Sequence, residues 1–123
     1  MSLLIYEQNT EKRRNLEQIL YDLYRQAEEA PSIYCVKNAR EAMAHMKKER
    51  VKAFFISLDD ARGQGYFLAK EMRERNPWLN VVVMADQPKY VQDVFHMLAS
   101  GYMLGELNRE KVQYELENLR FGM

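Results

Sequence analysis

The sequence predicts an α/β protein: one doubly wound sheet of five parallel strands with helices on both faces. Five short apolar runs alternate with five segments of helical periodicity, and short turns join them. The third run, residues 53–56, is apolar without interruption, which is typical of a strand buried on both faces of a parallel sheet. Right-handed crossovers then place the helices on both sides.

The expected elements follow one another along the whole chain. The runs that predict strands are residues 3–6, 32–36, 53–56, 79–84 and 102–104. Asparagine or threonine side chains can cap the first, second and last helices, at Asn9 or Thr10, Asn38 and Asn108. We expect Pro31 to end the first helix and Gly101 to end the fourth. The apolar face of that fourth helix is Val91, Val94, Phe95 and Leu98.

Length and composition indicate a single domain, residues 1–123, with a genuine core. The chain is 47% hydrophobic, and 18 basic residues balance 18 acidic ones. This balance argues against nucleic-acid binding by the segment and against attraction to an anionic membrane. No apolar run is long enough to span a bilayer and no secretion signal is present, so we expect a cytoplasmic protein. The single cysteine, Cys35, is expected to be packed in a strand rather than reactive.

Any active site should follow the third strand, at residues 57–60, because ligands of open α/β sheets bind outside the carboxyl ends of the strands. Residues 65–73, Gly-Tyr-Phe-Leu-Ala-Lys-Glu-Met-Arg, with Asn-Pro at residues 76–77, resemble the third-helix signature of one family. Residues 101–104, Gly-Tyr-Met-Leu, are similar to the same family's entry into its fifth strand. That family is the CheY-like receiver domain of two-component response regulators, especially those with a LytTR-type DNA-binding domain. The resemblance covers essentially the whole chain and implies a flavodoxin-like fold.

Receiver domains accept a phosphoryl group on an aspartate at the end of the third strand. The resemblance also implies a Mg²⁺ held by acidic residues after the first strand, a hydroxyl after the fourth strand and a lysine after the fifth. At the matching positions this sequence has Ser57 for the aspartate, Glu7 and Gln8 for the acidic pair, Ala85 for the hydroxyl and Gly105 for the lysine. The pocket should therefore be degenerate, with no metal, no cofactor and no enzymatic activity.

Several alternatives remain open at this stage. Asp59 or Asp60 can take over the phosphate, or both can cap the following turn through local hydrogen bonds. Ser57 as a catalytic nucleophile needs a nearby base, and His45 and His96 are poorly placed. Flavin or nucleotide binding at residues 7–10 has only weak support, because helix capping explains that segment.

The remaining prediction is a signalling or regulatory module that binds a protein partner or forms a homodimer. By resemblance, its surface would combine the fourth helix, fifth strand and fifth helix, and an ordinary amphipathic surface is the alternative. In a longer transcription regulator, an output domain could follow. The candidate interface residues are Tyr90, Asp93, Met97, Tyr102, Met103, Lys111 and Tyr114.

Overall fold

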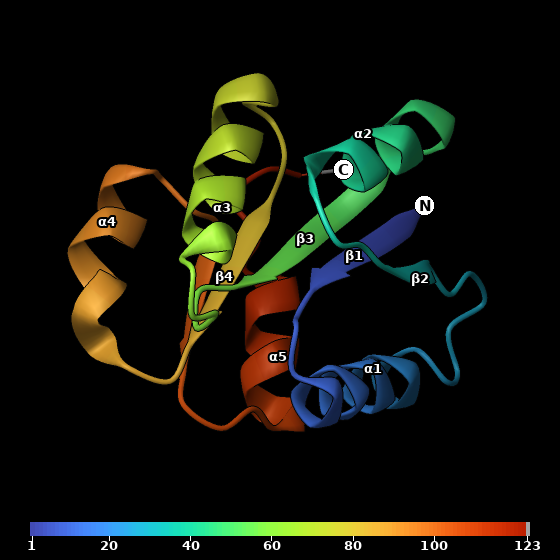
Figure 1. The fold of residues 1–123 in the computed structure, drawn as a ribbon. Helices are drawn as coiled ribbons and strands as arrows, with labels where there is room; N and C mark the ends of the chain where they lie inside the picture. The colour runs from blue at the N-terminus through green and yellow to red at the C-terminus, as the bar shows by residue number, and fades with distance from the viewer. Residues whose placement is uncertain (123) are drawn as a thin grey trace.

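A computed structural model describes residues 1–122 and has five strands and five α-helices in strict alternation (Figure 1). The strands are β1 (Ser2–Tyr6), β2 (Ser32–Cys35), β3 (Val51–Ser57), β4 (Val81–Ala85) and β5 (Gly101–Leu104). The helices are α1 (Thr10–Leu23), α2 (Ala39–Lys48), α3 (Gln64–Arg75), α4 (Val91–His96) and α5 (Arg109–Glu117), and a 3-10 turn η1 (Pro88–Tyr90) leads into α4.

All strands are parallel and lie in the order β2-β1-β3-β4-β5, which confirms the predicted doubly wound sheet. The central strand β3 pairs with β1 and β4, for example through Phe55 opposite Ile5 and Val82. Because the strands are parallel, their carboxyl ends share one edge of the sheet and their amino ends share the opposite edge. These two edges carry different chemistry.

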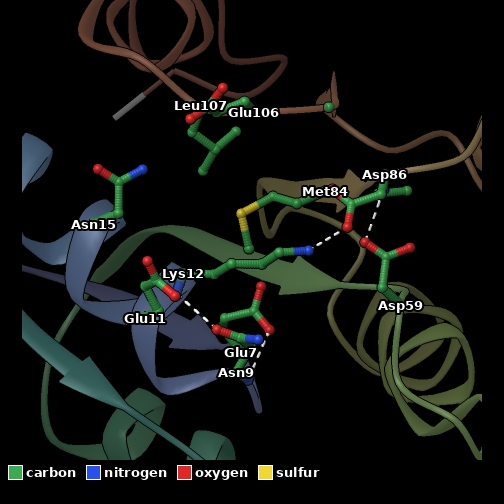
Figure 2. A pocket seen from close by; sticks show the side chains of 12 residues that line it. Glu7, Asn9, Glu11, Lys12, Asn15, Asp59, Met84, Asp86, Glu106 and Leu107 are labelled. Carbon is green, nitrogen blue, oxygen red and sulfur yellow. Dashed lines mark hydrogen bonds and ion pairs between the residues drawn. The ribbon is translucent and has the colours of Figure 1, made fainter.

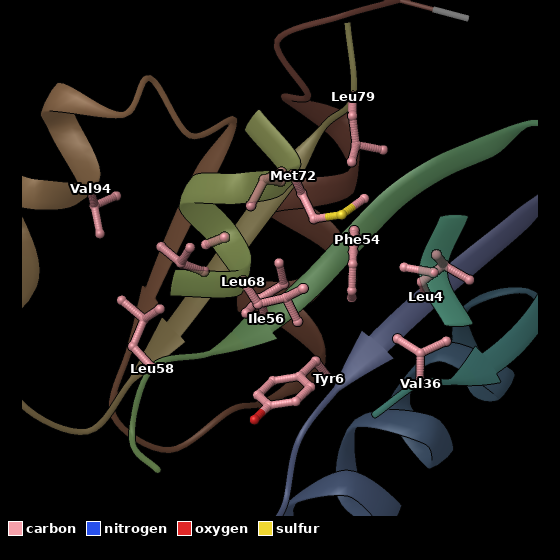
Figure 3. Packing of buried hydrophobic residues seen from close by; sticks show 14 of the residues in the cluster. Leu4, Tyr6, Val36, Phe54, Ile56, Leu58, Leu68, Met72, Leu79 and Val94 are labelled. Carbon is pink, nitrogen blue, oxygen red and sulfur yellow. The ribbon is translucent and has the colours of Figure 1, made fainter. Parts of the chain in front are cut away.

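Two apolar layers cover the sheet. The larger layer joins β-strand side chains to α2, α3 and α4, with Leu68, Met72 and Val94 from the helices (Figure 3). The other layer packs Leu16 and Leu20 of α1 and Val112 of α5 onto the opposite face. Side chains of this size contribute about 1.5–3 kcal/mol each when fully buried, which fixes the strand register.

Local signals position the helices that carry the site. Asn9, Asn38 and Asn108 each accept a backbone N–H three residues on, at 2.9–3.0 Å, and so begin α1, α2 and α5. The backbone approach between α3 and β3 is very close, because a Cβ added to Gly65 would lie 1.8 Å from the Ser57 carbonyl oxygen. Glycine at residue 65 therefore sets the position of α3 against the end of β3.

Some expected boundaries are wrong. Helix α1 ends at Leu23, well before Pro31, and the intervening residues form turns instead of a further helical turn. Gly101 does not end α4, since it is the first residue of β5. The residue that ends this helical segment is Leu98, whose φ of 58° lies in the left-handed region.

Burial also differs from expectation at two places. Cys35 is exposed, because β2 is an edge strand with only partial cover. The expected apolar face of α4 is mostly uncovered: Val94 is buried, whereas Val91, Leu98 and Phe95 are exposed, Phe95 to 76%. Helix α4 has only six residues, and Val94 is the only one of them that is buried. Within residues 1–122, no helix has the length and apolar character needed to cross a membrane.

Candidate functional site

A cavity of about 520 Å³ opens at the carboxyl edge of the sheet, beside the ends of β1, β3, β4 and β5 (Figure 2). Its walls come from the start of α1 and from the loops after β3, β4 and β5. The side chains around it are mainly polar and charged. The lining residues are Glu7, Asn9, Glu11, Lys12, Asn15, Asp59, Met84, Ala85, Asp86, Gly105, Glu106 and Leu107.

Lys12 is the central cation of this cavity. Its side chain extends from α1 past Met84, and its Nζ forms an ion pair and hydrogen bond with Asp86 Oδ2 (Figure 2). The hydrogen bond to Asp86 raises the pKa of Lys12 more than burial lowers it, and Asp59 and Glu7 raise it further. Lys12 therefore stays protonated and links α1 to the loop that follows β4.

Asp86 is held from a second side by Asp59. Asp59 Oδ2 accepts a hydrogen bond of 2.8 Å from the Asp86 backbone N–H. The Asp59 side chain thus lines the cavity and bridges the loops after β3 and β4 (Figure 2). The Asp59 carboxylate therefore faces the cavity and binds the loop after β4 rather than the turn that follows β3.

Glu7 supplies a carboxylate at the end of β1. Burial raises its pKa above the usual 4.5, and the nearby Asp59 acts in the same direction. The Asn9 N–H, which donates to Glu7 Oε2 at 3.1 Å, together with Lys12 and Ser57, opposes this shift. Gln8 is exposed and does not line the cavity, so one carboxylate remains where the resemblance implies a pair.

Ser57 ends β3 and is only 3% exposed. Its Oγ lies 3.4 Å from the Asp59 N–H. Ala85 lines the cavity with a methyl group, and Gly105 has a φ of 79°, with open space where a Cβ would stand. A lysine at residue 105 would therefore be strained in this backbone conformation.

Asp60 turns away from the cavity. Its Oδ2 accepts hydrogen bonds from the Tyr6 hydroxyl at 2.9 Å and from the Gly65 N–H at 3.2 Å, near the start of α3. Its Oδ1 is buried without a hydrogen-bond partner. Capping of the next helix therefore describes Asp60, while Asp59 faces the cavity.

The cavity does not fit the divalent cation that the resemblance implies. Across residues 1–122, no three His, Cys, Asp or Glu side chains are placed to hold one metal ion together. The Lys12 ammonium already neutralises Asp86. Mg²⁺ prefers several oxygen ligands in near-octahedral order, and a lysine beside them competes for the same carboxylate. The interaction that the charged side chains of the cavity do make is the ion pair of Lys12 with Asp86.

The residues predicted to form the interaction surface differ in exposure. Tyr90, Met97 and Tyr102 are half-buried, and Asp93, Lys111 and Tyr114 are exposed. Met103 is a correction: it is 2% exposed and packs in the core with α1 and α5, because alternate residues of β5 face opposite sides. Four other exposed apolar side chains of this region were not among the interface candidates: Val91, Phe95, Leu98 and Leu104.

Sequence reasoning missed Lys12 and Asp86 as pocket residues. Lys12 lies in the first turn of α1, away from the strand ends at which functional groups were expected. Its role depends on the reach of a long side chain across the sheet edge, which periodicity does not predict. The adjacency of Asp86 to Ala85 was the only available signal for its place in the cavity.

No family model and no curated protein sequence matches this chain. Solved structures do match its fold. The Vibrio cholerae chemotaxis protein CheY4 superposes with a TM-score of 0.76 at 16% identity, over 96% of this chain and 97% of that one. The receiver domain of a Pseudomonas aeruginosa sensor histidine kinase, with magnesium in its active-site cleft, gives 0.76 at 15% identity over 96% and 95%. Salmonella enterica RcsB, bound to a promoter with phosphomimetic BeF3⁻, gives 0.72 at 16% identity over 99% and 69%. The chain therefore has the fold of CheY-like response regulator receiver domains over nearly its whole length.

Proposed function

We propose that this chain is a receiver-like domain that signals by binding protein partners and does not accept a phosphoryl group at the end of β3. The observation that carries the proposal is Ser57, a nearly buried hydroxyl at the carboxyl end of the central strand. A serine there offers no carboxylate to attack a phosphoryl donor or to bind a metal. We place this domain in the cytoplasm, and treat residues 1–123 as one unit.

Electrostatics around the cavity supports the same function. Phosphoryl transfer needs cations facing the charge that develops on the phosphoryl oxygens. Here five carboxylates line the cavity, and Lys12 is already paired with one of them. Gly105 provides neither a cation nor a backbone conformation that accepts lysine easily. The five carboxylates also oppose binding of flavin or nucleotide phosphate.

The expected partner surface is the exposed face of α4, β5 and α5. Phe95 and Tyr114 are more than half exposed there, and Asp93 and Lys111 contribute opposite charges. Aromatic side chains with a charged rim are typical of protein interfaces. The partner can be a second copy of the chain, another protein or an output domain in a longer chain.

A second function has one observation in its favour. Asp59 lines the cavity and lies close enough to Lys12 to influence the Lys12 pKa. A phosphoryl group on Asp59 would then have a cation nearby, whereas Asp60 is occupied by Tyr6 and Gly65. Phosphorylation at Asp59 is therefore the alternative to test, with Asp60 second.

Incubation with acetyl phosphate and Mg²⁺, followed by intact-mass and peptide analysis, tests both functions. We expect no phosphorylated adduct on the wild-type chain. An ordinary receiver domain that is phosphorylated under the same conditions serves as the positive control. An adduct that Asp59→Asn abolishes and Asp60→Asn retains would establish the alternative. Sedimentation of the wild type and of Phe95→Ser tests the partner surface, and we expect self-association to weaken in the variant.

A further inference from the structure

The amino edge of the sheet contains a saturated hydrogen-bond site around Asn80. Asn80 precedes β4 and is 1% exposed. Its Oδ1 accepts from the Phe121 N–H and from Ser100 Oγ, both at 2.8 Å. Its Nδ2 donates to the Phe121 carbonyl at 2.9 Å and to the Lys52 carbonyl at 3.0 Å. One buried amide therefore satisfies both backbone polar groups of Phe121, as a neighbouring strand would.

The side chain of Phe121 packs against one aromatic ring, that of Trp78, and one cation, the Arg73 guanidinium; we call these two side chains the Phe121 seat. Its ring meets Trp78 edge to face, with centroids 5.5 Å apart. The Arg73 guanidinium lies 5.5 Å from the same ring centroid. This arrangement combines two favourable contacts of aromatic rings, with another ring and with a cation.

Arg73 is itself fixed by backbone oxygens. Its Nη1 donates to the carbonyls of Pro77 at 3.1 Å and Leu79 at 3.0 Å, and its Nε donates to the Met97 carbonyl at 3.2 Å. With a fourth bond from Nη1 to the Asn76 carbonyl at 3.4 Å, the guanidinium is held by four carbonyls near the ends of α3 and α4 and is preorganised for contact with the ring. Preorganised groups lose little conformational entropy when a ligand binds to them.

We propose that Asn80, Arg73 and Trp78 form a peptide-binding site whose ligand in this chain is its own segment, residues 120–122. Asn80 pairs with the backbone of an extended segment, and the seat formed by Arg73 and Trp78 selects a phenylalanine side chain. Asn80 also accepts a hydrogen bond from Ser100, and Arg73 donates one to the Met97 carbonyl. The same two residues therefore connect the segment after α5 to the segment after α4, and we call this connection the latch. None of these groups lines the cavity at the carboxyl edge, so this proposal does not rest on the proposed function.

Amide hydrogen exchange of the intact wild-type chain tests the latch without any substitution. We expect the Phe121 amide to exchange at least about tenfold more slowly than in an unstructured peptide, because its N–H donates to the buried Asn80 Oδ1. Exchange at the unstructured rate would overturn the proposal.

Fluorescence provides a second readout, because Trp78 is the only tryptophan in the sequence and is 79% exposed. Phe121→Ala should shift the Trp78 emission and raise the exchange rate at residue 121 about tenfold. Phe67→Ala is the matched control, since Phe67 is an exposed phenylalanine of α3 that contacts Tyr66. We expect that control to leave both readouts unchanged. Equal effects of the two substitutions would contradict the assignment of the seat to Phe121.

A peptide added in trans distinguishes a binding site from simple packing. Acetylated Leu-Arg-Phe-Gly amide, the sequence of residues 119–122, should return the Trp78 emission of the Phe121→Ala protein toward that of the wild type. The same peptide with alanine in place of phenylalanine should have no effect. Absence of a saturable change at millimolar peptide would reject the binding site.

Discussion

The two edges of the sheet satisfy their polar groups in different ways. At the amino edge, Asn80 and Arg73 make most of their hydrogen bonds to backbone groups. At the carboxyl edge, Lys12 and Asp86 meet in an open cavity among further carboxylates. Asn80 is buried and neutral and Arg73 is half-buried and held by backbone carbonyls, whereas the pair of Lys12 and Asp86 is charged and nearly half exposed.

This difference indicates which edge holds the structure together and which can respond to its surroundings. A buried amide loses much if its partners are removed, because each abandoned group stays desolvated. An exposed ion pair loses little, because water and salt replace it. We therefore expect substitutions at the amino edge to change stability, and substitutions at the carboxyl edge to change charge with little loss of stability.

The largest expected effect is at the amino edge. Asn80→Leu keeps the branching and the number of side-chain heavy atoms but leaves the Lys52 carbonyl and both backbone groups of Phe121 without partners. The free energy of unfolding, measured by urea denaturation, should fall by about 3 kcal/mol. The control is Asn15→Leu, an exposed asparagine beside the cavity, which should stay within about 0.5 kcal/mol of wild type. Similar losses for the two would remove the distinction between the edges.

The next largest effect tests backbone packing at the carboxyl edge. Gly65→Ala would place a Cβ 1.8 Å from the Ser57 carbonyl oxygen, so α3 or the end of β3 must shift. We expect a loss of about 2 kcal/mol despite the higher helix propensity of alanine. Gly122→Ala is the control, because nothing lies within 4 Å of its added Cβ and its φ is not positive. A neutral Gly65→Ala would mean that the junction of β3 and α3 yields easily.

The sequence predicted the layers of the fold because apolar periodicity records burial directly. Phe54, Phe55 and Ile56 are apolar and fully buried, and they form the centre of β3 as expected. The helix boundaries that were predicted wrongly depend on tertiary contacts, which the local sequence pattern does not record. Gly101 resembles a helix terminator, but a Cβ there would stand 2.0 Å from Glu115 Oε2, so tertiary packing also explains glycine at that position.

The candidate site was predicted less completely. Glu7, Asp59, Ala85 and Gly105 do line the cavity, as their positions after strands predict. Lys12 was missed because its ammonium acts several residues from its own backbone position, on Asp86 in another loop. The Asn80 site was missed for a similar reason, since residues 52, 80, 100 and 121 meet only in the folded chain.

A smaller effect compares one carboxylate at each edge. Burial raises the pKa of Glu7 and of Glu115, which packs against Gly101, above the usual 4.5. The folded state then binds the proton more tightly than the unfolded state, so stability falls as pH rises from about 4.5 through the folded pKa. Glu7→Gln and Glu115→Gln cannot ionise and should avoid this loss. For each variant, the change in the free energy of unfolding relative to wild type should be more favourable at pH 7 than at pH 4. The difference should be less than about 1 kcal/mol, since both carboxyls are half-exposed.

Glu7→Gln and Glu115→Gln should differ in how much stability each gains at pH 7. Only burial acts on Glu115, whereas Lys12, Asn9 and Ser57 partly stabilise the charged form of Glu7. Urea denaturation at a series of pH values should therefore give a larger gain for Glu115→Gln. A larger gain for Glu7→Gln would show that the polar groups of the cavity do not compensate its burial.

The smallest expected effect concerns the ion pair between Lys12 and Asp86. A double-mutant cycle with Lys12→Met, Asp86→Asn and the combined variant isolates the pair from the other contacts of each side chain. Both side chains are nearly half exposed, so the coupling energy should be about 0.5 kcal/mol at low ionic strength. It should decline further in 1 M salt, where screening is effective within about 3 Å. A coupling above about 2 kcal/mol that persists in salt would mean that Lys12 and Asp86 act as a desolvated pair. In that case the carboxyl edge would be held as firmly as the amino edge, and the cavity would be a fixed structural element rather than a responsive one.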